Sequence, residues 1–106
     1  MKIVGVAACI TGVAHTYMAQ EAIEQECKKR GYDVKVETQG GMGIENELSE
    51  DEIAEADVVI LAIAIGIEGT ERFEEKEDAG LVISLNPAEA VRDPSAIIDK
   101  AEKLAN

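Results

Sequence analysis

Residues 2–16 read KIVGVAACITGVAHT, and this stretch decides the fold. Its first part is a short, mostly apolar run, which predicts a buried β-strand over residues 2–8. A turn is predicted next, followed by a helix over about residues 15–30. Apolar side chains recur every four residues of this helix, from Ala19 to Cys27, so one stripe of it is expected to face the core.

The next elements are predicted from alternation and from capping residues. Valines alternate with charged residues over residues 33–38, as expected of a half-exposed strand. The glycine-rich residues 39–43 are predicted to form a flexible loop. Ser49 and Glu52 have the spacing of a capping box, which predicts a short helix that ends near Glu55.

The second half of the chain repeats the pattern of strands and helices. Its most apolar run, residues 57–65, predicts a central strand. The segment around residue 72 has no clear pattern, and a fourth strand is predicted over residues 81–85. Pro87 and Pro94 are each placed to open a helix, since proline fits the first helical position.

Together these elements predict a Rossmann-like α/β fold, a four-stranded parallel sheet with helices on both faces. The chain has 106 residues, 46% of them hydrophobic, so residues 1–106 are expected to form one domain with a substantial core. No apolar run approaches the roughly 20 residues that cross a bilayer. The N-terminal run fits a buried first strand better than a signal peptide.

The composition excludes several kinds of function. The net charge of −12 argues against nucleic acid and against adsorption to anionic lipid. Acidity of this kind aids solubility, and it could also steer the domain toward basic surfaces of partner proteins. One histidine and two separated cysteines give no metal-ligand spacing, so no metal is expected, and the cysteines are interpreted as thiols in a reducing cytosol.

The turn that follows the first strand has the residues for anion chemistry. It lies at the carboxyl end of a parallel strand, where such sheets bind their ligands. Amides at a helix start bind anions, and Gly12 would let the turn fold tightly around one. The same helix terminus would favour the thiolate form of Cys9, which could accept a phosphoryl group whose oxygens meet the Thr11 and Thr16 hydroxyls.

Each candidate residue also has a structural alternative. Cys9 could be a small buried residue at a strand end. His15 could cap the helix, pair with the thiolate or phosphate, or act as an acid or base. Cys27 is predicted to lie in the core. Arg72 could bind phosphate or form a solvent-exposed salt bridge with a nearby glutamate.

Two further groups of residues have alternatives of the same kind. Glu45 and Asn46 could line the site or form a turn. The acidic run over residues 71–78 is interpreted as a solvated surface.

Several motifs in order along the chain resemble those of one family. They are KIVGVAAC, TGVAHT, VETQG, GIENEL, DVVILA and ERF. With their spacing, they are similar to the fructose-specific enzyme IIB domains of the phosphoenolpyruvate-dependent sugar phosphotransferase system, over nearly the whole chain.

The resemblance implies a protein-phosphocysteine–sugar phosphotransferase that needs no cofactor. Cys9 would take a phosphoryl group from a phosphohistidine of the IIA domain and pass it to a sugar, typically fructose, held by the membrane component IIC. It implies a cytoplasmic protein that docks transiently on IIC without inserting into the membrane. The implied phosphate-binding loop consists of Ile10, Thr11, Gly12, Val13, Ala14, His15 and Thr16.

One residue departs from the family pattern. Ile10 stands where the family commonly has proline. Unlike proline, isoleucine has a backbone N–H donor, and its φ angle is not fixed by a ring. The phosphoryl chemistry is expected to survive this change. Two other functions stay open: a regulatory relative that senses phosphorylation without sugar transfer, and a small cysteine phosphatase, although His15 and Thr16 stand where a phosphatase needs arginine. A redox role for Cys9 has less support than either of these functions, since the chain has no Cys-x-x-Cys motif.

Overall fold

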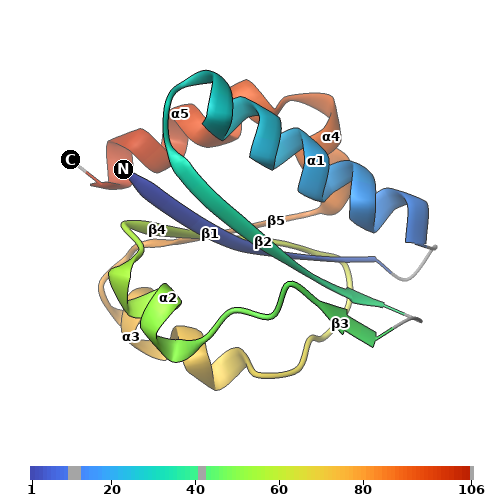
Figure 1. The fold of residues 1–106 in the computed structure, drawn as a ribbon, viewed down its shortest axis with the longest axis horizontal. Helices are drawn as coiled ribbons and strands as arrows, with labels where there is room; N and C mark the ends of the chain where they lie inside the picture. Colours follow the sequence, from blue (N-terminus) through green and yellow to red (C-terminus); the bar gives the residue numbers. More distant parts are fainter. Residues whose placement is uncertain (10–12, 41–42, 106) are drawn as a thin grey trace.

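The computed structural model describes residues 1–9, 13–40 and 43–105 (Figure 1). Strands and helices alternate over most of its length. In chain order the elements are β1 (Lys2–Ala8), α1 (Val13–Lys29), β2 (Asp33–Gly40), β3 (Gly43–Glu45), α2 (Glu50–Glu55), β4 (Val58–Ile63), the 3₁₀ helix η1 (Thr70–Phe73), α3 (Glu74–Asp78), β5 (Val82–Leu85), α4 (Pro87–Arg92) and α5 (Pro94–Ala105).

One mixed sheet with the strand order β3-β2-β1-β4-β5 forms the centre of the fold. The strands β2, β1, β4 and β5 are parallel, while β3 runs antiparallel to β2. The chain passes from β1 to β2 on one side and then crosses to β4 on the other side of β1. The order of the strands therefore reverses at β1, and a crevice is expected beyond the carboxyl ends of the strands at such a point.

Helices cover both faces of the sheet: α1, α4 and α5 lie on one face, and α2, η1 and α3 on the other (Figure 1). Alternate residues of β1 supply both cores, since Ile3 and Ala7 belong to one cluster and Val4 and Val6 to the other. A strand buried on both faces must be apolar almost throughout, which explains its composition. No helix within the described residues combines the length and the apolar character that crossing a membrane requires.

The predicted α/β class and the two helical layers are confirmed. The four predicted strands are present and parallel, but the sheet has a fifth strand, the antiparallel β3, which was not predicted. The most apolar run forms β4, which pairs with β1 and β5 and so lies inside the sheet. The capping box is present as predicted: the Ser49 hydroxyl accepts from the Glu52 amide at 3.2 Å, and the Glu52 carboxylate accepts from the Ser49 amide at 2.9 Å. Pro87 and Pro94 begin α4 and α5.

Two predictions around β2 were wrong. The expected flexible loop is partly strand, because β2 continues to Gly40 and pairs with Gly43 and Ile44 of β3. The expected half-exposed alternation also fails near the end of β2, where Glu37 has no exposed surface. The segment 64–73 covers this part of the strand, and alternation within β2 contains no information about that distant segment.

The unpatterned segment around residue 72 is anchored by an aromatic side chain. Phe73 ends η1, is 1% exposed and packs with Val4, Val59 and Ile53 in the core beneath α2. The Arg72 guanidinium lies 5.1 Å from the centre of the Phe73 ring. The buried ring anchors this segment to the core, together with the partly buried Ile67, which packs against the same cluster.

Phe73→Ala is expected to lower the free energy of unfolding by about 3–5 kcal/mol, because it removes a ring from a closely packed core. Urea denaturation followed by circular dichroism measures the change. Met18→Ala is the control: Met18 is 48% exposed, and its truncation should change stability by no more than about 0.5 kcal/mol. Equal stability of the two variants would mean that Phe73 does not anchor the segment.

Candidate functional site

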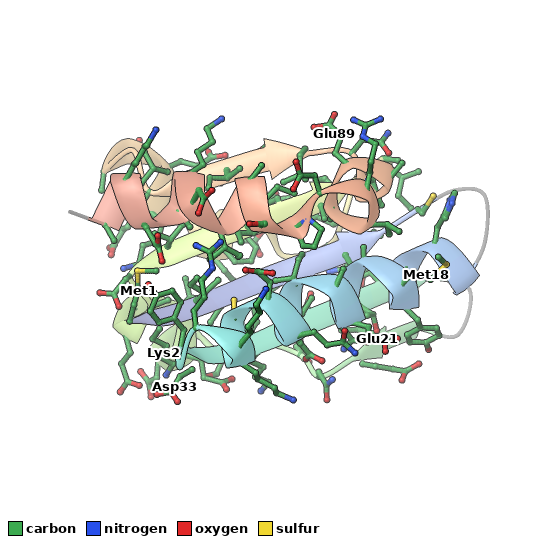
Figure 2. All side chains as sticks on the ribbon, turned by 90° about the horizontal axis from the view of Figure 1, so that it is seen from above. Met1, Lys2, Met18, Glu21, Asp33 and Glu89 are labelled. Carbon is green, nitrogen blue, oxygen red and sulfur yellow. The ribbon has the colours of Figure 1, made fainter. Side chains whose placement is uncertain are left out.

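Cys9 lies at the carboxyl end of β1, at the point where the strand order reverses. The Ala64 amide donates to the Ala8 carbonyl at 3.0 Å, so the segment leaving β4 begins beside Cys9. Figure 2 shows Met18 of α1 at the opposite end of the sheet from Met1, Lys2 and Asp33, which mark the amino ends of β1 and β2. The N-terminal part of α1 therefore lies at the same edge of the sheet as Cys9.

Cys9 is half-buried and opens onto a groove of about 480 Å³. The groove is bounded by β2, by β3 and by the segment that follows β4. Its other lining residues are Gln39, Gly40, Gly43, Ile44, Ile65 and Glu68. Ile44 is 37% exposed, so one side of the groove is apolar, while Gln39 and Glu68 form a polar side. The strand β3, which was not predicted, therefore supplies one side of the site.

Two side chains of the first turn of α1 approach the site. The Cys9 Sγ lies 3.9 Å from Nδ1 of His15, which is exposed. Thr16 is 4% exposed, and among the described residues its Oγ1 is buried without a hydrogen-bond partner. The first turn of α1 contains no acidic residue, although the chain has 22 of them. An anion at this helix end would therefore meet amide donors without a carboxylate in the same helical turn.

Part of the predicted phosphate-binding loop can be placed. The residues Ile10, Thr11 and Gly12 lie outside the described part of the chain, and Val13 and Ala14 are described as the first helical residues of α1. The helix thus begins two residues earlier than predicted. The assignment of the seven residues 10–16 to a phosphate loop stays a prediction, as does the role of Cys9.

Cys27 has the opposite environment to Cys9. Its side chain is fully buried, as predicted, on the face of α1 that packs into the core shared with α4, α5 and the sheet. Burial, together with the negative charge of Glu26, raises the pKa of the Cys27 thiol to about 12. Neither cysteine is in a disulfide. The environment thus separates the two thiols into one that faces a groove and one that is inert.

The alternative of a solvent-exposed salt bridge for Arg72 was wrong. Its side chain is only 12% exposed, and it forms a salt bridge at 2.8 Å with the fully buried Glu37 of β2. The partner is therefore a buried residue of β2 and none of the neighbouring surface glutamates. Burial by itself raises the pKa of the Glu37 carboxyl. Hydrogen bonds from Arg72, Gln39 and the Leu48 amide outweigh that effect and hold this pKa below its ordinary value.

Glu45 and Asn46 do not line the described part of the groove. The Tyr17 hydroxyl donates a hydrogen bond to the Glu45 carboxylate, which connects α1 to β3. Asn46 has a φ of 53°, as suits the turn that was the alternative interpretation. Within the described residues, no three histidine, cysteine or acidic side chains gather as a metal site.

The fold and the site define the class: an α/β protein that presents a thiol beside a helix N-terminus. The family model described as "PTS system, Lactose/Cellobiose specific IIB subunit" matches residues 4–100. The PTS system fructose-like EIIB component 2 of Escherichia coli strain K12 is 50% identical over 101 residues, which are 95% of this chain and 92% of that protein.

Solved structures agree with these relatives. A domain of the fructose-specific IIABC component from Borrelia burgdorferi has a TM-score of 0.85 at 48% identity, covering 94% of this chain and 91% of that chain. The enzyme IIB subunit of the PTS from Escherichia coli K12 has a TM-score of 0.87 at 38% identity, covering 97% of this chain and 92% of that chain.

The chain belongs to the IIB family of the sugar phosphotransferase system (PTS). As a IIB component, it takes part in a phosphotransferase step of sugar uptake together with IIA and IIC components. The family description and the relatives' names give different sugars, lactose or cellobiose in one case and fructose-like in the other. They agree on the component and leave the sugar open.

Iodoacetamide is expected to alkylate Cys9 alone in the folded protein, because Cys27 is fully buried and its thiol has a pKa of about 12. Intact-mass spectrometry should show one adduct on the native protein and two in urea. Two control variants test the assignment. Folded Cys9→Ser should show no adduct, and folded Cys27→Ala should show one. Rapid native labelling of Cys27 would contradict the division between the two thiols.

Proposed function

We propose that this IIB component carries the phosphoryl group on Cys9. In this proposal Cys9 takes the group from a phosphohistidine of a IIA domain and passes it to a sugar bound by the membrane component IIC. One observation supports the proposal most directly: the half-buried Cys9 thiol faces a groove at the carboxyl end of β1, where the strand order reverses.

The two transfers balance as displacements at phosphorus. In the first, an S–P bond forms at Cys9 while the N–P bond of the phosphohistidine breaks, and the electron pair of that bond returns to the imidazole nitrogen. In the second, a sugar hydroxyl oxygen forms an O–P bond while the S–P bond breaks. The sulfur leaves as thiolate, and the hydroxyl proton passes to solvent. Such transfers depend mainly on positioning and on electrostatic stabilisation of the phosphoryl oxygens.

The N-terminus of α1 is suited to stabilise those oxygens. This helix has 17 residues, so its aligned peptide dipoles and terminal amides favour an anion at its start. The buried Thr16 hydroxyl is available for a further hydrogen bond. His15 Nδ1, at 3.9 Å from the Cys9 sulfur, is near enough to meet a phosphoryl group on that sulfur. The loop from Ile10 to Thr16 would complete the cradle, as the family resemblance implies.

Fructose is the sugar that this proposal favours. The relatives named fructose-like and the domain of a fructose-specific component are 38–50% identical to this chain. The net charge of −12 would favour docking on basic surfaces of the IIA and IIC partners.

Cys9→Ser is expected to abolish formation of the phosphoprotein, because the serine hydroxyl cannot replace the thiolate as acceptor. Intact-mass spectrometry after incubation with phosphoenolpyruvate, the general PTS proteins and a fructose-type IIA domain measures this. The wild type should gain one phosphate. Cys27→Ala is the control and should also gain one. Equal phosphorylation of Cys9→Ser would reject the site assignment, and release of inorganic phosphate by the chain alone would indicate a phosphatase.

His15→Ala is expected to slow phosphoryl transfer by about 100-fold, the lower limit of the range for a single acid–base group. The fold should be unaffected, since His15 is exposed. Quenched-flow mass spectrometry gives the transfer rate, and thermal unfolding gives the stability. An unchanged transfer rate would reduce His15 to a structural residue.

A further inference from the structure

The polar side of the Cys9 groove is built by a segment without regular structure. Residues 64–69 join β4 to η1 and form neither helix nor strand. Two of them, Ile65 and Glu68, line the groove. Such a segment keeps its place only if its backbone groups are bound from outside.

Two side chains supply hydrogen bonds to this backbone. The Gln39 side chain accepts from the Glu68 amide at 2.8 Å and donates to the Glu68 carbonyl at 3.0 Å. The Arg72 guanidinium donates from Nη2 to the same Glu68 carbonyl at 3.2 Å and from Nε to the Gly69 carbonyl at 2.8 Å. Glu68 is therefore held from two sides.

Arg72 uses all of its donors in this arrangement. A guanidinium has five N–H groups. Two of the five bind the segment, at Glu68 and Gly69. Two more bind the oxygens of Glu37, from Nη1 at 2.8 Å and from Nη2 at 3.0 Å, and Nη1 also donates to the Leu48 carbonyl at 2.8 Å. Every N–H thus has an acceptor, which leaves none to bind a phosphoryl group.

Glu37 is equally occupied, and it connects Arg72 to Gln39. Besides the two bonds from Arg72, its carboxylate accepts from Gln39 Nε2 at 2.6 Å and from the Leu48 amide at 2.8 Å. Because Gln39 binds both Glu37 and the Glu68 backbone, the ion pair and the groove belong to one hydrogen-bonded network. The carboxylate has no exposed surface, so its charge depends on these partners.

Gly69 makes this arrangement possible. Its φ is +75°, and a Cβ atom at this position would lie 2.5 Å from Arg72 Nε. The turn therefore lets the guanidinium approach the backbone of the segment directly.

We propose that Arg72 and Glu37 are positioning residues for phosphoryl transfer: Arg72 directly, and Glu37 through Gln39, hold the segment 64–69 at the distance from Cys9 that partner and phosphoryl group require. This inference rests on the proposed carrier function of Cys9. Neither residue touches the reacting atoms. Their effect on the rate is indirect, since displacing a site by about 1 Å can cost up to about 100-fold.

Arg72→Lys tests the inference, because the ammonium of lysine has three donors on one nitrogen and cannot replace the five of arginine. Hydrogen exchange of the Glu68 amide should become faster by about tenfold or more, as expected when charged hydrogen bonds are lost. The rate of phosphoryl transfer at saturating IIA phosphoprotein should fall by about 10- to 100-fold. The final amount of phosphoprotein should stay at one phosphate per chain, in contrast to Cys9→Ser.

Arg30→Lys is the matched control. Arg30 is 18% exposed and likewise binds several acidic side chains, at 2.8 Å to Glu26, 2.8 Å to Asp99 and 3.1 Å to Glu102. It follows the C-terminal end of α1, away from Cys9. This variant should lose stability while keeping both the Glu68 exchange rate and the transfer rate of the wild type.

The outcomes separate this inference from the proposed function. Unchanged Glu68 exchange or an unchanged transfer rate in folded Arg72→Lys overturns the inference, and so does an equal loss of rate in Arg30→Lys. A wild type that accepts no phosphate contradicts the carrier function, while Glu68 exchange still decides whether Arg72 holds the segment. If Arg72→Lys does not fold, Gln39→Ala removes the connection between Glu37 and Glu68 while leaving Glu37 and Arg72 paired and Arg72 bound to the Glu68 carbonyl. Faster Glu68 exchange together with slower transfer is then expected, and an unchanged transfer rate overturns the inference.

Discussion

The parallel pairing of β1 with β2 on one side and β4 on the other is the constraint on which the rest of the structure depends. It buries β1 on both faces, and it brings the carboxyl ends of the parallel strands to one edge of the sheet. Since α1 must return to the start of β2, its N-terminus also lies at that edge. The thiol of Cys9, the helix end and the groove are together because of this topology.

The buried ion pair of Glu37 and Arg72 fixes the segment 64–69, which is not part of the sheet. The carboxylate of Glu37 would be very unfavourable in the interior without a partner, and loss of one member of such a pair typically costs about 3–5 kcal/mol. The bonds to Arg72, Gln39 and Leu48 remove this penalty only in one arrangement of the chain. The pair therefore contributes to a unique position of the segment 64–69 as well as to stability.

The two cysteines show how environment divides the chemistry of identical side chains. Cys27 lies on the buried face of α1, in the core that α1, α4 and α5 form with the sheet, where burial keeps its thiol protonated. Cys9 lies at a strand end beside a groove and a helix N-terminus that lacks acidic residues. A carrier needs one nucleophile that its partners can reach, and a second thiol does not interfere when it is enclosed in the core.

Much of this protein was determined by the sequence itself. Apolar runs predicted β1 and β4, and capping residues and prolines predicted the starts of α2, α4 and α5. Cys9 was also predicted to lie beside the first helix. These features could be predicted because each depends on residues that are near neighbours in the chain. The family resemblance also came from short local motifs. Tertiary structure alone decided that β3 borders the groove, that Glu37 is buried and that Arg72 binds it across 35 residues of sequence. These contacts depend on how segments far apart in the sequence pack together, and the local pattern of residue types does not contain that information.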